Sequence, residues 1–131
     1  MIITQTPFRI SFLGGGTDYS SYCETHGGAV LGTAIHHSAY LSVTRFYSRL
    51  FDYSIRIAYR KVECVRSLDQ IEHAPFRECL RYAGITSDVE INYTGELPSF
   101  SGLGSSSSFV VGLLNALAAF KNRRVRPLDL A

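Results

Sequence analysis

An uncharged stretch of chain at 97–120 places the strongest constraint on how this sequence folds. It begins with Pro-Ser-Phe-Ser-Gly-Leu-Gly-Ser-Ser-Ser-Ser-Phe at 98–109 and continues as an apolar run. That run predicts a helix over about 106–121 with apolar residues nearly all round, as in a helix buried at the centre of a domain. Because the apolar part at 109–120 is much shorter than the roughly 20 residues of a membrane span, the sequence predicts a core helix and no membrane partner.

The glycines and serines that precede this helix suit an anion. A helix N-terminus presents unpaired backbone N–H groups and a partial positive charge. Glycine lets the backbone approach a ligand closely, and serine hydroxyls add hydrogen-bond donors and a possible metal ligand. The lysine of the Walker A motif is missing, the third glycine of a dinucleotide fingerprint is replaced by Ser107, and there is no Gly-x-Ser-x-Gly elbow. A lysine-free phosphate loop remains.

Composition narrows the class of protein. The 131 residues are 46% hydrophobic and 18% charged, which predicts one globular domain with a sizeable core. The net charge of +2 is too small to argue for a nucleic-acid partner. Three cysteines, with no close pair and no basic, apolar leader before them, predict reduced thiols in a cytoplasmic protein.

Alternating apolar residues and turn signals predict a strand-rich α+β chain. Strands are expected at 8–12, 29–35, 39–46, 53–59, 62–65 and 89–94, and helices at 18–25 and 75–83. His36-His37-Ser38 is interpreted as the turn of a hairpin, and 67–70 has the form of a capping box. The last residues, 127–131, resemble the first turn of another helix, so the chain is expected to be the N-terminal part of a larger protein.

The loop at 98–107 resembles the second motif of the GHMP kinases, Pro-x3-Gly-Leu-x-Ser-Ser-x, without a gap. This family includes galactokinase, homoserine kinase, mevalonate kinase and phosphomevalonate kinase. The resemblance implies an ATP-dependent phosphotransferase whose N-terminal domain, a mixed or antiparallel sheet packed on helices, spans 1–131, with the C-terminal domain absent. It implies ATP and Mg²⁺ as cofactors, with Ser106 as the metal-holding serine. The residues implied to bind the nucleotide are Pro98, Gly102, Leu103, Gly104, Ser105, Ser106, Ser107 and Ser108.

A second segment, 6–19, looks like the first motif of the same family. By resemblance, Arg9 lies near the transferring phosphoryl group and offsets its developing charge. The acceptor sugar is implied to bind at Gly15, Gly16, Thr17 and Asp18, where the carboxylate accepts hydrogen bonds from hydroxyls. Two alternatives stay open: Asp18 as the N-cap of the next helix, and Arg9 as a solvated residue of an edge strand.

The choice of sugar follows from departures within this motif. Gly-Gly-Gly at 14–16 replaces the Gly-Glu-His of galactokinase, which argues against galactose. The motifs look closest to the branch that phosphorylates the anomeric hydroxyl of D-glycero-D-manno-heptose 7-phosphate for activated heptose and surface glycans. A fucose-type sugar kinase and a nucleic-acid-binding module of the same fold, also seen in a ribosomal protein domain, are the alternatives. The family's catalytic carboxylates fall outside this chain, so the fragment alone is expected to be inactive and the full-length protein is a possible homodimer.

Overall fold

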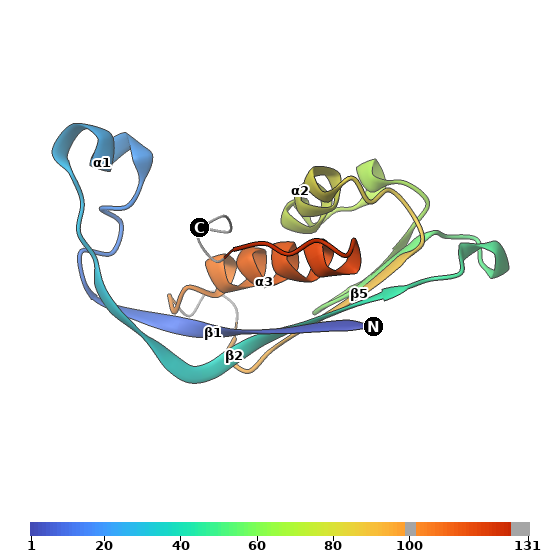
Figure 1. Ribbon diagram of the computed structural model, residues 1–131, viewed down its shortest axis with the longest axis horizontal. Helices are drawn as coiled ribbons and strands as arrows, with labels where there is room; N and C mark the ends of the chain where they lie inside the picture. Colours follow the sequence, from blue (N-terminus) through green and yellow to red (C-terminus); the bar gives the residue numbers. More distant parts are fainter. Residues whose placement is uncertain (99–101, 127–131) are drawn as a thin grey trace.

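A computed structural model describes residues 1–98 and 102–126 of the chain (Figure 1). The expected helical turn at 127–131 and the loop residues 99–101 lie outside the described residues. The elements are, in chain order, β1 (Ile2–Leu13), α1 (Ser20–His26), β2 (Leu31–Arg45), β3 (Ile55–Ala58), β4 (Val62–Val65), α2 (Ala74–Ala83), β5 (Val89–Gly95) and α3 (Ser105–Phe120), with short 3-10 helices at Ser48–Leu50 and Leu68–Gln70.

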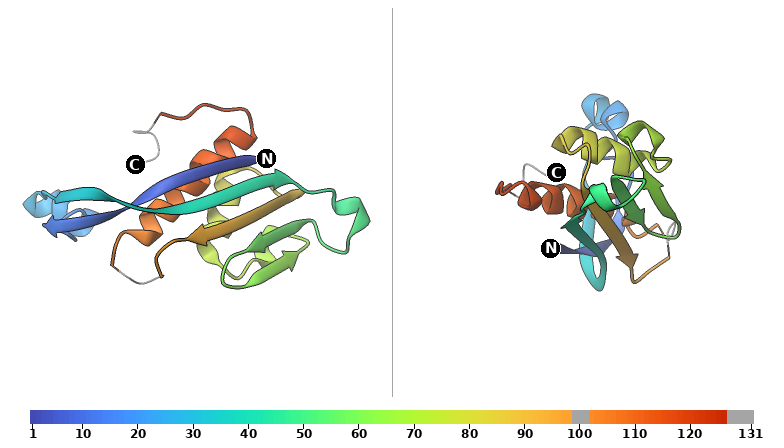
Figure 2. Two further views of the ribbon diagram at one scale, coloured as in Figure 1. Left: turned by 90° about the horizontal axis from the view of Figure 1, so that it is seen from below. Right: turned by 90° about the vertical axis from the view of Figure 1, so that its right-hand side faces the viewer.

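The strands form one sheet in the order β1-β2-β5-β3-β4. Every neighbouring pair is antiparallel except β3 and β5, which run parallel. Helices α2 and α3 lie on the same face of this sheet (Figures 1 and 2). The predicted α+β class with a mixed sheet packed on helices is therefore confirmed.

The core lies between that face of the sheet and the two helices. Alternate residues of a strand point to the same face, and the inward-facing set of the sheet is fully buried: Leu41, Val43, Ile55, Ile57, Val89 and Ile91. Phe76 and Leu80 of α2 and Leu113 and Leu117 of α3 cover them and are equally buried. Each such side chain contributes about 1.5–3 kcal/mol through removal of apolar area from water. Within residues 1–98 and 102–126, no helix is long and apolar enough to cross a membrane.

Helix α3 approaches β1 closely because it carries a glycine on its sheet-facing side. A Cβ atom added to Gly112 would lie 2.6 Å from Oγ1 of Thr6 and 3.1 Å from Cδ1 of Leu41. The hydroxyl of Thr4 also donates a hydrogen bond to the carbonyl of Gly112, 3.0 Å away. The first strand and the last helix are thus held together along their length.

The predicted hairpin with a turn at His36-His37-Ser38 is wrong. Residues 31–45 form a single strand, β2, that pairs with β1 along its length. The pairing steps from Pro7 with Ser38 to Arg9 with Ala34, so β2 carries extra residues at this point. A bulge absorbs such residues without ending the strand, and the two histidines lie in it with exposed side chains.

Three further predictions differ from the structure in detail. Strand β1 begins well before the predicted 8–12, and β3 is shorter than the predicted 53–59. Helix α1 has Tyr19 as its N-cap and no side-chain capping hydrogen bond, so the interpretation of Asp18 as its cap is wrong. Helix α2, its left-handed stop at Gly84 and the capping box of the 67–70 segment are confirmed.

Candidate functional site

Strand β1 and the glycine-serine loop, far apart in the sequence, meet in the structure. The backbone N–H of Arg9 donates to the carbonyl oxygen of Leu103 over 3.1 Å. Nearby, the hydroxyl of Ser108 donates to the carbonyl of Pro7 over 2.9 Å. These bonds attach both sides of the N-terminus of α3 to the middle of β1, so the two sequence motifs form one site.

The side chain of Arg9 lies against the start of α3. Gly104, the N-cap of α3, has a φ of 72°, in the left-handed region that favours glycine. A Cβ atom there would lie 2.8 Å from Cγ of Arg9 and 3.3 Å from its Nε. The guanidinium also donates a hydrogen bond to the hydroxyl of Ser11. Glycine at 104 therefore leaves room for an exposed cation beside the end of the helix that attracts anions.

The four serines at the start of α3 divide into two groups. Ser108 is buried, and its hydroxyl is engaged by β1. Ser106 and Ser107 are exposed and Ser105 is half-buried, and their hydroxyls form no hydrogen bond with the described residues. The first N–H groups of a helix also have no intrahelical partner. Hydroxyl and amide donors at 105–107 are thus available to a phosphate, and Ser108 serves as an anchor.

The side chains at this site can supply only a small part of the coordination shell of a magnesium ion. Among the residues that the structure describes, no group of three or more His, Cys, Asp and Glu side chains could hold a metal. Mg²⁺ in nucleotide sites keeps several waters and takes oxygens from phosphates and a few protein groups. The exposed hydroxyl of Ser106 fits the role of a single oxygen ligand.

The predicted sugar-binding turn lies beyond the end of β1. The hydroxyl of Thr17 donates to the carbonyl of Gly14 over 2.8 Å, and the backbone N–H of Ala29 donates to the Thr17 hydroxyl over 3.2 Å. Thr17 therefore closes the turn and ties it to the returning chain. Asp18 is exposed, and its carboxylate forms no hydrogen bond within the described residues. Of these two side chains, only that of Asp18 is uncommitted and able to accept from a ligand.

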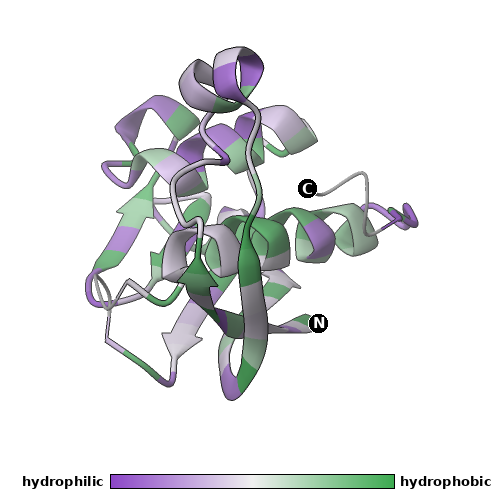
Figure 3. Ribbon diagram, turned by 90° about the vertical axis from the view of Figure 1, so that its left-hand side faces the viewer, coloured by the Kyte–Doolittle hydropathy of each residue, from purple (hydrophilic) through white to green (hydrophobic). Residues whose placement is uncertain are grey.

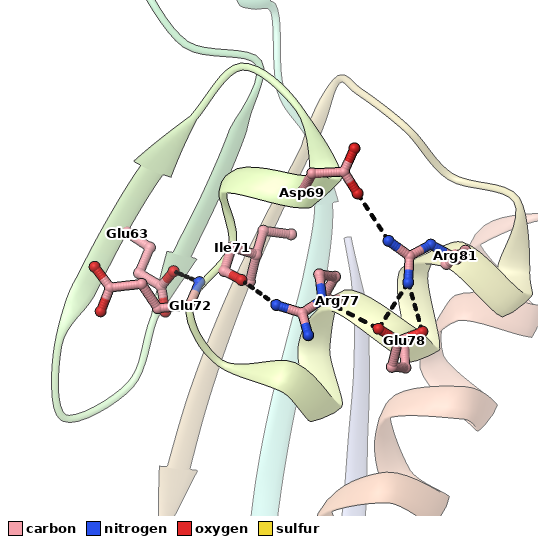
Figure 4. A network of polar contacts seen from close by, with 7 residues as sticks. All are labelled: Glu63, Asp69, Ile71, Glu72, Arg77, Glu78 and Arg81. Carbon is pink, nitrogen blue, oxygen red and sulfur yellow. Dashed lines mark hydrogen bonds and ion pairs between the residues drawn. The ribbon is translucent and has the colours of Figure 1, made fainter.

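A buried acid on β4 was missed by sequence reasoning. Glu63 is 5% exposed and pairs across the sheet with the buried Ile57. Its carboxylate accepts from the Tyr59 hydroxyl (2.8 Å) and from the backbone N–H of Glu72 (2.7 Å; Figure 4). Burial alone would raise the pKa of Glu63, but these bonds and the N–H of His73 outweigh it and hold the pKa below 4.5. The sequence signal for this burial was the position of Glu63 in the alternation of β4, which puts it on the inward-facing side of the strand.

The imidazole of His73 connects this network to α3. It lies against Tyr59 and Phe76, and its ring centroid is 5.6 Å from that of Phe109, the fifth residue of α3. Its buried Nδ1 has no hydrogen-bond partner among the described residues. Burial lowers the pKa of His73 below 6.5 and raises that of Tyr59 to about 12, with the bond to Glu63 as the second cause for Tyr59. A neutral imidazole thus packs against Phe109 near the start of α3.

Charged side chains on the outer face of α2 brace the same region. Arg77 donates to the carbonyl of Ile71 over 2.9 Å, and Arg81 pairs with Asp69 over 2.8 Å and with Glu78 over 2.6 Å (Figure 4). Exposed pairs of this kind are each worth little, at most about 1 kcal/mol. They hold the 3-10 turn at Leu68–Gln70 against α2.

Comparison with known proteins relates this site to a family. Residues 73–131 match the family described as GHMP kinases N terminal domain. The D-glycero-alpha-D-manno-heptose 7-phosphate kinase of Campylobacter jejuni is 30% identical over 99% of this chain and 41% of that protein. The chain therefore spans well under half the length of this curated relative.

Solved structures show the same fold. A D-glycero-D-manno-heptose 1-phosphate kinase from Bacteroides thetaiotaomicron aligns with a TM-score of 0.80 at 24% identity, over 99% of this chain and 45% of that one. A Streptococcus pneumoniae phosphomevalonate kinase, solved with phosphomevalonate and AMPPNP, aligns with a TM-score of 0.70 at 20% identity, over 99% and 41%. At these identities the likeness establishes the fold.

Proposed function

We propose that the protein to which this chain belongs is an ATP-dependent sugar kinase, in line with the match of residues 73–131 to the GHMP kinases N terminal domain and the 30% identity to a heptose phosphate kinase. The observation that carries the proposal is the 3.1 Å hydrogen bond from the Arg9 N–H to the Leu103 carbonyl. This bond supports the proposal because it holds Arg9 of the first motif against the glycine-serine loop of the second. Phosphoryl transfer needs this arrangement, because catalysis rests on positioning the two substrates and offsetting charge on the phosphoryl oxygens.

On the nucleotide side, the phosphates of ATP lie at the N-terminus of α3. Gly102, Leu103 and Gly104 let the loop backbone approach them, and Pro98 begins the loop. The exposed hydroxyls at 105–107 and the free helix N–H groups donate to phosphate oxygens. When bound, Mg²⁺ neutralises phosphate charge, and the Ser106 hydroxyl is the ligand this chain offers it. Ser108 contributes by holding the helix start on β1 rather than by direct contact.

On the acceptor side, the sugar lies against the turn after β1. Thr17 shapes that turn, and bare backbone at Gly15 and Gly16 lets the sugar approach. The uncommitted carboxylate of Asp18 accepts from neighbouring hydroxyls, a charge-assisted and hence stronger hydrogen bond. Arg9 lies between the two substrates and stabilises negative charge as the phosphoryl group moves.

The acceptor we propose is D-glycero-D-manno-heptose 7-phosphate, phosphorylated at its anomeric hydroxyl in the cytoplasm. The identity to the Campylobacter jejuni enzyme over nearly the whole chain supports this choice. A fucose-type sugar is the competing acceptor. Residues that act as the catalytic base belong to the part of the protein outside this sequence, so we expect these 131 residues alone to be inactive. We also propose that the complete protein forms a homodimer.

The experiment is an ATP-dependent phosphorylation assay with the longer protein, Mg²⁺ and a panel of heptose 7-phosphate, fucose and galactose. We expect turnover with the heptose phosphate and none with galactose. Arg9→Ala is expected to lower kcat by about 10²–10³-fold, as for loss of one transition-state donor, whereas Arg60→Ala, an exposed arginine at the β3–β4 turn, leaves it unchanged. Preference for fucose would reassign the substrate, and salt-sensitive RNA binding without phosphorylation would contradict the kinase.

A further inference from the structure

A pocket of about 270 Å³ lies on the face of the sheet opposite α3. Thr4 and Thr6 of β1 meet Gly112 of α3, so the alternate residues of β1 point to the other face. Figure 3 shows hydrophilic bands along the strands, whereas α3 is largely hydrophobic. We refer to the polar residues that line this pocket as the outer pocket: Gln5 of β1, His36, Ser38 and Tyr40 of β2, and Glu96 just after β5.

The bulge of β2 supplies one wall of the outer pocket. Between Pro7 and Arg9 of β1, the pairing passes over residues 35–37 of β2. A bulge bends its strand and re-aims side chains, and Ile35 and His36 line the pocket. Figure 1 shows β2 bowing away from the helices. The histidine-containing segment, which the proposed kinase site does not use, therefore borders a pocket.

Glu96 is held against β2 by hydrogen bonds in both directions. Its Oε2 accepts from the backbone N–H of Ser38 over 2.6 Å, and its own backbone N–H donates to the Ser38 carbonyl over 3.2 Å. Nδ1 of His37 lies 3.8 Å from the same Oε2. The other carboxylate oxygen, Oε1, has no hydrogen-bond partner in the part of the chain that the structure describes. One oxygen is therefore fixed in place and open to a ligand.

The hydroxyls of Ser38 and Tyr40 are arranged as donors. The side-chain amide of Gln5 donates to both, over 3.2 Å to Ser38 Oγ and over 3.1 Å to the Tyr40 oxygen. A hydroxyl that accepts from an N–H still has its own proton to donate, and neither proton is donated to any of the described residues. Because Ser38 is only 5% exposed, bulk water has little access to this unused donor.

We propose that the outer pocket binds a neutral polyhydroxyl ligand, of the class of sugars and polyols. Each ligand hydroxyl both accepts and donates, so it can accept from Ser38 or Tyr40 and donate to Oε1 of Glu96. Pro7 and Ile35 add apolar surface for the C–H face of such a ligand. The volume lies just below the roughly 300–1,000 Å³ of sites for drug-sized ligands, which favours about one sugar ring.

Other small ligands fit the outer pocket less well. An ammonium group has no lone pair to accept from the two hydroxyls. A phosphate would meet the carboxylate of Glu96, and no lysine or arginine is among the described residues that line the pocket. The site is also separate from the proposed acceptor turn that carries Asp18. The inference therefore does not depend on the kinase proposal, and its tests measure binding rather than turnover.

The first test is NMR of the longer protein with labelled tyrosine, in which the Tyr40 signal is identified by its loss in Tyr40→Phe. The probes are glycerol, D-mannose and L-fucose, with D-mannose 6-phosphate as a charged probe. We expect a neutral probe to shift the Tyr40 signal saturably, and the phosphate to bind at least about tenfold more weakly than the best neutral probe. No shift with any neutral probe up to about 100 mM overturns the proposal, as does tighter binding of the phosphate.

The second test follows the same Tyr40 signal in matched variants. Ser38→Ala removes one donor and is expected to weaken binding of the neutral probe by about 3–10-fold. Ser42→Ala, on the same strand and face but outside the pocket lining, is the control and leaves binding unchanged. Glu96→Gln removes the negative charge and is expected to narrow the preference for neutral over charged probes. Equal binding by the two serine variants, or an unaltered preference in Glu96→Gln, contradicts the proposal.

A third variant separates the outer pocket from the proposed acceptor site. Asp18→Asn removes the carboxylate that we propose for the acceptor sugar, and we expect it to leave the shift of the Tyr40 signal in place. Loss of that shift in Asp18→Asn would assign the bound probe to the acceptor turn and overturn the outer pocket. A kinase that phosphorylates its sugar without any shift at Tyr40 likewise rejects this inference alone.

Discussion

The hydroxyl of Ser108 donates a hydrogen bond to the carbonyl oxygen of Pro7, 2.9 Å away, and ties the first turn of α3 to β1. Since Ser108 is 6% exposed, water does not replace this bond when it is lost. Ser106, two residues earlier, is exposed. Two serines of one motif therefore have separable roles, one in stability and one in ligand binding.

Replacing these serines tests that separation. Ser108→Ala leaves the Pro7 carbonyl without its donor, and we expect it to lower the free energy of unfolding by about 1–3 kcal/mol. Ser106→Ala is the control, and its effect on stability is expected to stay within about 0.5 kcal/mol. Urea denaturation of both variants measures the difference. Equal stability of the two variants contradicts the anchoring role of Ser108.

The two glycines of the loop separate backbone strain from contact with Arg9. Gly102 and Gly104 have φ values of 74° and 72°, so alanine at either costs about 1–2 kcal/mol. Only at Gly104 does the added Cβ meet Arg9, since at Gly102 no atom of the residues that the structure describes lies within 4 Å of it. We expect Gly104→Ala to weaken nucleotide binding by the longer protein well beyond Gly102→Ala, by calorimetric titration with an ATP analogue. The same loss at both positions would show that strain alone matters.

Gly112 lies in the middle of α3, where alanine normally favours a helix by about 1 kcal/mol. Here we expect Gly112→Ala to destabilise the fold by about 1–3 kcal/mol, because its Cβ would crowd the Thr6 hydroxyl at 2.6 Å. Thr6→Ala removes that hydroxyl and is expected to recover part of the loss in the double variant. A double-mutant cycle of unfolding free energies measures the coupling. Additive effects rule out the contact as the cause.

Stability should fall on acidification in two steps. The pKa of His73 is lowered from 6.5, mainly by burial, so the unfolded chain takes up the proton first and stability declines as the pH falls below about 6.5. The pKa of Glu63 is also lowered, from 4.5, so its contribution is present above that pH and is lost as the pH falls further. Urea midpoints measured between pH 7.5 and 4 follow both steps.

His73→Gln is the variant that separates the two steps. It removes the titrating imidazole, so the decline that begins near pH 6.5 is expected to disappear and the step below pH 4.5 to remain. His36→Gln, at an exposed histidine of the β2 bulge, is the control and keeps both steps. A His73→Gln variant with the unaltered decline would assign the first step to another group.

Signals within the sequence of a segment predicted those helices and strands whose ends depend on that segment's own residues. Pro75 and Gly84 mark the start and the end of α2. The apolar run predicted α3, because a helix that is apolar nearly all round must be buried. The alternation at 89–94 likewise predicted β5. The fold class followed from this order of elements. The match of residues 73–131 to the GHMP kinases N terminal domain agrees with the family that the second glycine-rich motif suggested.

Long-range contacts decided the rest. His36-His37 has the polarity of a turn, but β1 offers a partner on both sides of it, so pairing extends through a bulge. Glu63 is polar by type, yet donors from Tyr59 and Glu72 make its burial favourable. Residue order by itself determined where α2 and α3 start and stop, because those signals act within a turn or two. Only the tertiary structure decided that Arg9 meets Leu103 and that Ser108 is an anchor, because these contacts join segments about a hundred residues apart.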